Sequence, residues 1–284
     1  IGMLQREEIV EFVTNPELIV RVLSANRLAD VAPVHTVRFG PARAQYVLLF
    51  EPSPDAPPRR SVVAFWHGGG WRLGSPGLFR CIGRFFAARG FTTLLGGYRL
   101  TPRWKYPAQL EDARQGLIAG LAAVGKLNLP ADRLLLGGQS AGAQLAALLV
   151  HSPNGTDLLP PDVQINGLFL ISGPLNFSVS GQSTYIRDML RSYAGPKHQW
   201  NKADPIRHVQ SGRSVPILCV QGEQDPHVFP ENSISYLETV RRYNAGPTDL
   251  ICVSWGLHSN VVKIFLEPSP EAQRFVNWLV AHDE

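Results

Sequence analysis

The sequence predicts an α/β fold in which a mostly parallel sheet is covered by helices on both faces. Segments typical of strands alternate with segments typical of helices six times, as expected for right-handed strand–helix–strand crossovers. Most of the expected strands are continuously apolar, which is the pattern of strands buried on both faces. We therefore expect residues 1–284 to form a single α/β domain.

The expected elements follow one another along the chain. The strand patterns at 34–40 and 45–52 come first, and the alternating residues of the first predict a half-buried antiparallel pair. The strands after them are more continuously apolar, and we place them at 61–67, 91–98, 133–139, 165–173, 216–223 and 250–256. Helical patterns lie between or after these strands, at 78–90, 106–127, 140–152 and 269–283.

Two stretches fall outside this alternation. Residues 1–30 are amphipathic and are expected to be helical, and residues 174–214 are too long for an ordinary connection. The second stretch contains a possible short helix at 184–195. We expect these two stretches to form a small cap over the carboxyl end of the sheet.

Composition and charge exclude several classes of protein. The formal net charge is +4 with an isoelectric point near 9.1, but Lys and Arg are scattered, which argues against a nucleic-acid partner. No apolar window is long enough for a membrane helix, and the N-terminus lacks a signal-peptide pattern. Three cysteines inside apolar runs (Cys81, Cys219, Cys252) are expected to be buried thiols, which favours a reducing, cytoplasmic location. A homodimer is left open.

The candidate nucleophile is Ser140, within Gly138-Gln139-Ser140-Ala141-Gly142. This G-x-S-x-G motif lies between an apolar strand and an apolar helix, where small residues at both ends allow a sharp strand-to-helix turn. The alternative is a serine that only caps the helix. The context favours catalysis.

A serine nucleophile needs a base, and the base needs an acid that orients it. Asp225 follows the strand at 216–223, and His258 follows the strand at 250–256, so all three side chains are expected at the same edge of a parallel sheet. Glu223 is the competing acid, and His227 is expected to shape the acid loop. His151 and His208 lack a comparable placement, and His198 lies in the expected cap region, where surface exposure is favoured over contact with substrate. No residues have the spacing of a metal site, and no cofactor is expected.

Attack by Ser140 on a carbonyl creates an oxyanion, which needs backbone amides as donors. The amide of Ala141 supplies one of them. The others are expected from "HGGGW", residues 67–71, because glycines after a central strand allow the backbone to approach a ligand closely.

The segments "HGGGW", "YRLTPRWKYPAQLED", "GQSAG", "GEQDPHV" and "GLHSN" occur in this order, and together they resemble the α/β-hydrolase superfamily. Within it, residues 35–284 are most similar to hormone-sensitive-lipase-like carboxylesterases and to kynurenine formamidases. The resemblance implies an α/β-hydrolase fold with an eight-stranded, mostly parallel sheet. It also implies that Gly69 and Gly70 join Ala141 in the oxyanion hole and that His67 holds the glycine loop. A supporting block is implied at Tyr98-Arg99-Leu100 and Glu111-Asp112.

The chain departs from these relatives at two positions. Gly97 stands where the lipase-like esterases usually carry aspartate, and Gln139 stands where they usually carry an acidic residue. Trp71 is the candidate substrate-binding residue, although packing of the loop against the core is the favoured role for it.

These observations predict a serine carboxylesterase that cleaves small to medium esters with short-chain acyl or aryl groups. One alternative is an arylformamidase that hydrolyses N-formylkynurenine, because the formamidase glycine loop also ends in tryptophan. Another is a non-catalytic binding protein of the same fold. The complete Ser–Asp–His set favours an enzyme.

Overall fold

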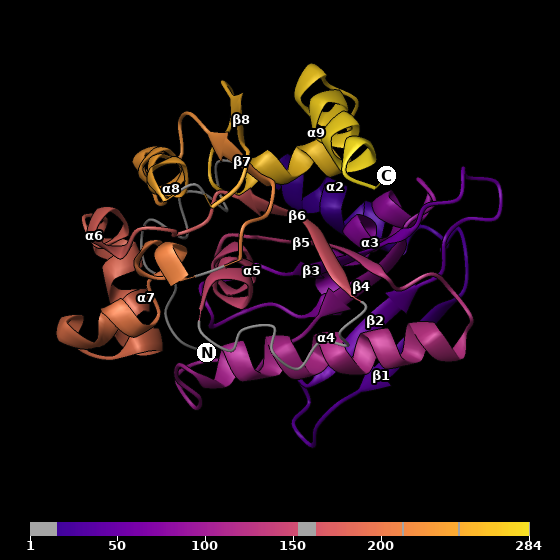
Figure 1. The fold of residues 1–284 in the computed structure, drawn as a ribbon, viewed down its shortest axis with the longest axis horizontal. Helices are drawn as coiled ribbons and strands as arrows, with labels where there is room; N and C mark the ends of the chain where they lie inside the picture. Colours follow the sequence, from indigo (N-terminus) through magenta and orange to yellow (C-terminus); the bar gives the residue numbers. More distant parts are fainter. Residues whose placement is uncertain (1–15, 153–162, 212, 244, 284) are drawn as a thin grey trace.

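The computed structural model describes residues 16–152, 163–211, 213–243 and 245–283. A twisted sheet with the strand order β1-β2-β4-β3-β5-β6-β7-β8 runs through the molecule (Figure 1). β2 is antiparallel to both of its neighbours, and every pairing from β4 to β8 is parallel. The strands are β1 (Val34–Arg38), β2 (Tyr46–Phe50), β3 (Ser61–Trp66), β4 (Thr92–Gly96), β5 (Arg133–Gln139), β6 (Gln164–Ile171), β7 (Ile217–Gly222) and β8 (Thr248–Val253). This confirms the predicted eight-stranded, mostly parallel sheet.

Burial along the strands follows their place in the sheet. All residues of β3 and β4 are buried, as their apolar sequences predict. β1 is an edge strand and keeps exposed positions. The half-buried pattern expected for both of the first two strands is wrong for β2, of which four residues are buried and one is half-buried. The reason is that β2 lies between β1 and β4, with helices on both faces.

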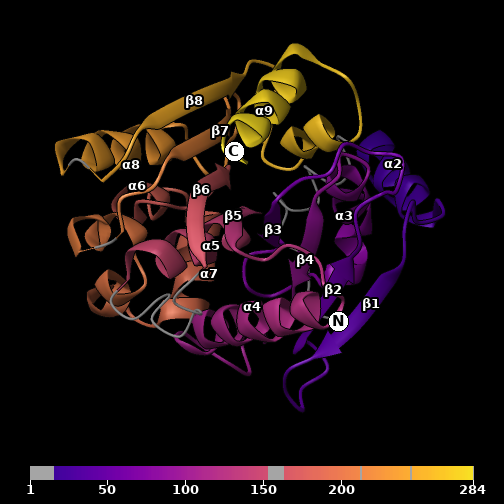
Figure 2. The same cartoon turned by 45° about the vertical axis from the view of Figure 1, so that its right-hand side comes forward.

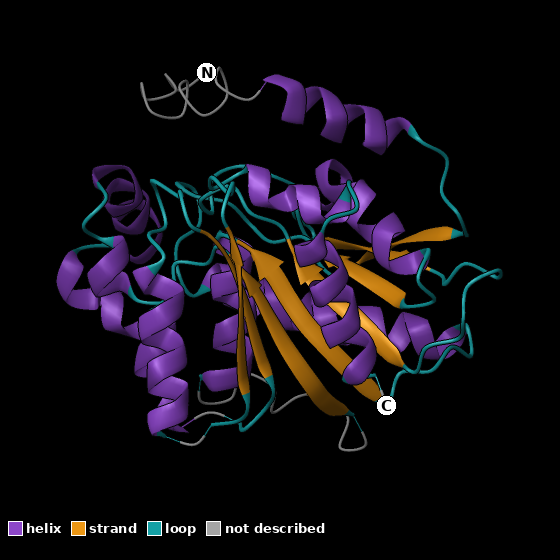
Figure 3. Ribbon diagram, turned by 90° about the horizontal axis from the view of Figure 1, so that it is seen from above, coloured by secondary structure: helices purple, strands orange, loops and turns teal. Residues whose placement is uncertain are grey.

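Helices cover the two faces of the sheet, as Figures 2 and 3 show from different sides. One face packs against α4 (Ala108–Lys126), α5 (Ala141–His151) and α8 (Glu231–Arg242). The opposite face packs against α3 (Arg80–Ala87) and α9 (Pro270–Ala281). Every residue of α5 is buried, so the helix that follows Ser140 is surrounded by protein on all sides.

The described part of residues 174–214 contains α6 (Phe177–Ser180), α7 (Thr184–Ala194) and short 3₁₀ turns. The helix expected at 184–195 is therefore confirmed. Its N-terminus is capped by Ser183, whose hydroxyl accepts from the amide of Ile186. The Tyr106 amide donates to the Tyr193 carbonyl at 2.9 Å, which attaches α7 to the loop before α4.

The other segment expected in the cap, residues 1–30, lies partly outside the described residues, which begin at residue 16. α2 (Pro16–Arg27) is helical, as expected, and lies beside α3. The side chain of Asn26 donates to the Leu78 carbonyl and accepts from the Cys81 amide. A cap role for this segment stays a prediction.

Within the described residues, no helix combines the length and the apolar character needed to cross a bilayer. The cysteines are all free thiols. Cys81 and Cys219 are buried as expected, and burial raises the pKa of Cys219 to about 12. The expectation of burial is wrong for Cys252, which is exposed because it lies on the edge strand β8.

Candidate active site

Ser140 occupies a sharp turn between β5 and α5. Its φ of 53° and ψ of −120° are unusual for a residue with a side chain, so the backbone is strained at this turn. A Cβ built on Gly138 would lie 2.7 Å from the Ala143 nitrogen, and one built on Gly142 would lie 2.6 Å from the His67 carbonyl oxygen. The motif therefore needs glycine at both ends, because no larger residue fits without moving the backbone.

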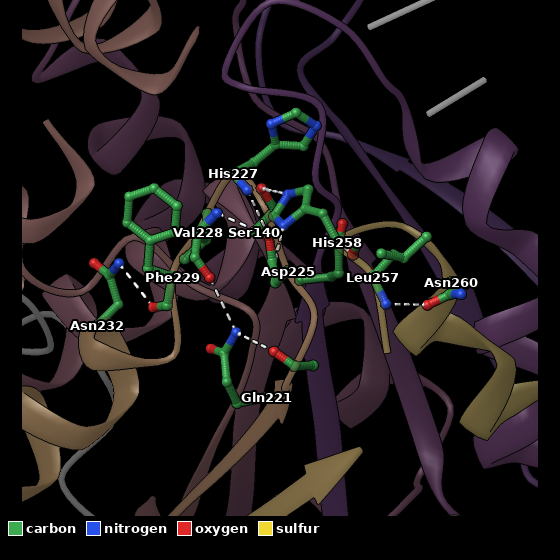
Figure 4. Close-up of polar contacts among 12 residues, drawn as sticks. Ser140, Gln221, Asp225, His227, Val228, Phe229, Asn232, Leu257, His258 and Asn260 are labelled. Carbon is green, nitrogen blue, oxygen red and sulfur yellow. Dashed lines mark hydrogen bonds and ion pairs between the residues drawn. The ribbon is translucent and has the colours of Figure 1, made fainter. Parts of the chain in front are cut away.

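The three side chains expected at one sheet edge form a hydrogen-bonded chain (Figure 4). The Nε2 atom of His258 lies 2.9 Å from the Ser140 hydroxyl, and Nδ1 lies 2.8 Å from Oδ2 of Asp225. The Asp225 side chain is fully buried and the His258 side chain is 13% exposed. The arrangement allows the imidazole to take the hydroxyl proton while the carboxylate fixes its orientation.

Backbone amides hold the acid in place. Oδ1 of Asp225 accepts from the amides of His227 at 3.0 Å and Val228 at 2.8 Å, which leaves Oδ2 for His258. Gln221 supports the same loop by donating to the Val228 carbonyl at 3.0 Å. The competing acid, Glu223, is exposed, and among the described residues it is Asp225 that bonds to His258.

The loop that carries His258 is also braced. Oδ1 of Asn260 accepts from the Leu257 amide, and its Nδ2 donates to the Trp255 carbonyl. His227 lies beside this loop, with its ring centroid 5.8 Å from that of His258, and its backbone amide belongs to the acid loop through the bond to Asp225. His151 lies elsewhere, buried against Tyr236, and burial lowers its pKa to about 4.

The glycine loop after β3 has a backbone that few residues can adopt. Gly69, Gly70 and Trp71 all have positive φ, at 116°, 57° and 58°. The ring of His67 stacks on Tyr98 with centroids 4.4 Å apart, and its Nδ1 lies 2.8 Å from the Gly68 carbonyl oxygen. Because His67 is buried, its pKa falls to about 4, so the ring is neutral at pH 7 and braces the loop without a buried charge.

The loop lies directly against the turn at Ser140. A Cβ on Gly68 would overlap the side chain of Gln139 and would lie 3.1 Å from the backbone carbonyl oxygen of Gln139. Within the described part of the chain, the amides of Gly69, Gly70 and Ala141 donate to no protein acceptor. These are the three amides expected to bind an oxyanion.

The block expected to support the loop is assembled as the resemblance implies. The Tyr98 hydroxyl donates to the His67 carbonyl at 2.8 Å. Asp112 is fully buried and accepts at 2.8 Å from the backbone amide of Arg99, from its Nε and from Gln45. The hydrogen bond to Asp112 raises the pKa of Arg99. The unusual Gly97 is explained by the lack of room for a side chain, since a Cβ there would overlap the Ala44 carbonyl oxygen.

Trp71 is only 1% exposed. Its ring stacks on Tyr193 with centroids 4.1 Å apart, and its Nε1 donates to the Gln144 side chain at 3.1 Å. The structure therefore favours the packing role, and the prediction of substrate contact gains no support from a ring with so little free surface.

Sequence reasoning missed the residues of α7 that face the site. Tyr185, Met189 and Tyr193 recur every four residues and so share one face of the helix. Tyr185 packs on His227 with centroids 4.6 Å apart, and Met189 lies so close to Gly70 that its Cε would be 2.8 Å from a Cβ there. This i, i+4, i+8 spacing is the signal that could have identified them.

A comparison with known protein families identifies the chain. The BD-FAE family model matches residues 49–239, more than half of the sequence. The chain belongs to the BD-FAE family. The matched residues of this BD-FAE chain include the glycine loop, Ser140 and Asp225, whereas His258 lies beyond them.

Curated relatives of this BD-FAE chain include several esterases. A probable isoprenylcysteine α-carbonyl methylesterase, ICMEL1 of Arabidopsis thaliana, is 26% identical over 214 residues, which cover 69% of this chain and 45% of the relative. An ethyl acetate hydrolase of Pseudomonas putida is 30% identical over 107 residues, covering 37% and 34%. The chain spans less than half the length of the curated relatives that match first.

Solved structures show the same fold. Esterase B of Lactobacillus rhamnosis, inhibited by a tributyrin phosphonate, superposes with a TM-score of 0.78 at 20% identity, covering 99% of this chain and 96% of that one. The BD-FAE chain therefore has the α/β-hydrolase fold expected from its motifs.

Proposed function

We propose that this chain is a serine carboxylesterase that cleaves small to medium esters through an acyl-enzyme intermediate. The observation that carries the proposal is the hydrogen-bonded chain from Ser140 to His258 to Asp225 at the start of a buried helix. This arrangement supplies the nucleophile, the general base and the orienting acid that acyl transfer to a serine requires.

In the first half-reaction, the Ser140 oxygen attacks the ester carbonyl carbon as His258 Nε2 takes the hydroxyl proton. The negative charge passes to the carbonyl oxygen, which accepts hydrogen bonds from the amides of Gly69, Gly70 and Ala141. When the tetrahedral intermediate collapses, the bond to the alcohol oxygen breaks, and the imidazolium returns its proton to that oxygen. The alcohol leaves and the acyl group remains on Ser140.

In the second half-reaction, a water molecule takes the place of the alcohol. His258 accepts a proton from the water as its oxygen attacks the acyl carbon, and the same three amides stabilise the second oxyanion. The bond from the carbon to the Ser140 oxygen then breaks, and His258 returns the proton to that oxygen. The products are a carboxylic acid and the free enzyme.

Short acyl groups are the proposed substrates. Met189 lies against Gly70, beside the proposed oxyanion site, and so limits the room for an acyl chain. The names of similar proteins agree with a short acyl group, because one relative is an ethyl acetate hydrolase and esterase B was inhibited by a phosphonate of tributyrin.

The proposed location is the cytoplasm, which the three free thiols support. Light scattering distinguishes a monomer from the homodimer that the sequence leaves open.

The proposal is tested by labelling and turnover together. A fluorophosphonate probe should label the wild-type protein and fail to label Ser140→Ala. A p-nitrophenyl ester series from acetate to decanoate should give its highest kcat/KM at four carbons or fewer. A higher kcat/KM for N-formylkynurenine would replace the esterase with an arylformamidase. Absence of labelling on the intact wild-type protein would instead favour a non-catalytic binding protein.

A further inference from the structure

Gln144 lies buried where three segments of the site meet. It is located one helical turn after Ser140 on α5, and its backbone N–H donates to the Ser140 carbonyl at 3.2 Å. Its side-chain Oε1 accepts from Nε1 of Trp71 at 3.1 Å and from the Tyr193 hydroxyl at 3.2 Å. Its Nε2 donates to the Ala203 carbonyl at 2.7 Å. One side chain thus joins the nucleophile helix, the glycine loop and residues 174–214.

The chemistry of the partners fixes which way this amide points. An indole N–H can only donate, and a backbone carbonyl can only accept. Oε1 must therefore face Trp71, and Nε2 must face Ala203. No other orientation of the Gln144 amide satisfies both neighbours, so the side chain holds them at a defined separation.

Trp71 is the residue of this loop whose backbone conformation most needs support from its neighbours. Its φ of 58° lies in the left-handed region, where a bulky side chain is strained. Three contacts keep it there: the Thr101 amide donates to its carbonyl at 2.8 Å, Tyr193 stacks on its ring, and Gln144 accepts from its indole. Gly69 and Gly70 directly precede it in the same tight turn, so the position of Trp71 determines where their amides lie.

We propose that Gln144 is a positioning residue that fixes the oxyanion-binding amides of the glycine loop relative to Ser140. It acts through Trp71, and the bonds to Tyr193 and Ala203 tie residues 174–214 to the same point. This inference rests on the proposed serine-hydrolase function, because the amides matter only if an oxyanion forms.

The decisive variant is Gln144→Leu, which keeps the volume and removes all three side-chain hydrogen bonds. Loss of one oxyanion donor typically costs about 10²–10³-fold in kcat. Displacing the Gly69 and Gly70 amides should therefore lower kcat on p-nitrophenyl butyrate by about tenfold or more, while KM changes by less than about threefold. The rate constant for fluorophosphonate inactivation should fall with kcat.

Three further variants separate positioning from general stability. Gln109→Leu is the matched control, because Gln109 is a buried glutamine on α4 that donates to the Trp104 carbonyl; it should lower the melting temperature without changing kcat. Trp71→Phe removes the indole N–H together with part of the ring that stacks on Tyr193, and it should also lower kcat. The effects of Trp71→Phe and Gln144→Leu should be less than additive, because both remove the bond between Gln144 and Trp71. Gln144→Glu keeps two acceptor bonds and should recover part of kcat.

The outcomes are distinct. If the wild-type protein hydrolyses esters and both Gln144→Leu and Trp71→Phe keep kcat, the positioning inference is overturned and the proposed function stands. If Gln144→Leu does not fold, unchanged kcat in Trp71→Phe overturns the inference by itself. If the fluorophosphonate does not label the wild-type protein and the wild-type protein hydrolyses no ester, the proposed function is overturned, and the inference with it.

Discussion

Gly142 lies against the backbone of Trp66, so close that a Cβ on this glycine would overlap the Trp66 carbonyl oxygen. The contact joins the first turn of α5 to the end of β3, where the glycine loop begins. The last glycine of the G-x-S-x-G motif thus sets the distance between the nucleophile and the proposed oxyanion hole. The two motifs depend on glycine for different reasons, since Gly142 must let backbone meet backbone whereas Gly69 and Gly70 adopt positive φ.

We predict that Gly142→Ala lowers kcat/KM on short esters by about 100-fold or more, since a displaced oxyanion donor costs that much. The atoms that the new methyl group would meet belong to the backbone of β3 and His67, so they cannot move aside as a flexible side chain could. The measurement is steady-state hydrolysis of p-nitrophenyl butyrate, with a thermal melt of the same preparation.

Gly125→Ala is the matched control for that substitution. Gly125 lies in α4, and a Cβ there meets nothing within 4 Å. Alanine in an exposed helical position should stabilise the protein by about 0.5–1 kcal/mol and leave activity unchanged. Equal activity of Gly142→Ala and wild type would show that the close approach is not needed for catalysis.

Asp225→Asn should lower kcat by about 10²- to 10⁴-fold with little change in stability. The asparagine oxygen can still accept from the His227 and Val228 amides, but its NH₂ group faces Nδ1 of His258 and favours the wrong tautomer. Glu223→Gln makes the same chemical change on an exposed carboxylate two residues away and should leave kcat unaffected. A large loss in Glu223→Gln with none in Asp225→Asn would reassign the acid.

The sequence predicts much of this site because its turns depend on local chemistry. Strands that end in Gly-rich or Ser-containing turns identify the sheet edge, and chain order then identifies Asp225 and His258. The bond between Gln144 and Trp71 could not be predicted in this way. It joins residues on two separate elements, and glutamine in an apolar helix has no distinctive local pattern.

Two features of the fold also could not be predicted from the local sequence pattern. α8 was not among the expected helices, because "ENSISYLETVRR" is polar and buries Asn232 and Ser233 beside Tyr236 and Leu237. The exposure of Cys252 depends on β8 being the last strand of the sheet, which strand order alone decides. In both cases tertiary packing, rather than the local pattern, determines burial.

Met189→Ala should shift substrate preference toward longer acyl chains. Met189 covers Gly70 from α7, and removing its side chain opens space beside the proposed oxyanion hole. We expect the ratio of kcat/KM for octanoate over butyrate to rise by about tenfold, since each added methylene in a pocket can be worth about 10-fold or more. Met189→Leu keeps the volume and should keep the wild-type ratio. An unchanged ratio in Met189→Ala would mean that the acyl chain lies elsewhere.

Asp204 should make the stability of the protein depend on pH between about 4 and 7. This buried carboxyl accepts from the Phe177 amide at 3.0 Å, but burial raises its pKa from 3.8 to about 7. Between these two values the unfolded chain releases the proton while the native protein retains it. The native state thus binds more protons, and the free energy of unfolding falls as pH rises through this window and is lowest above pH 7.

Asp204→Asn should remove that dependence. Asparagine keeps the acceptor for Phe177 and has no proton to lose, so the variant and wild type should be similar near pH 4, and the variant should be more stable near pH 8. Asp188→Asn removes an exposed carboxylate from α7 and should follow the wild-type curve. Urea unfolding at pH 4, 6 and 8 measures all three proteins, since unfolding free energies extrapolate linearly in denaturant. A constant difference between Asp204→Asn and wild type across that range would contradict native-state protonation of Asp204.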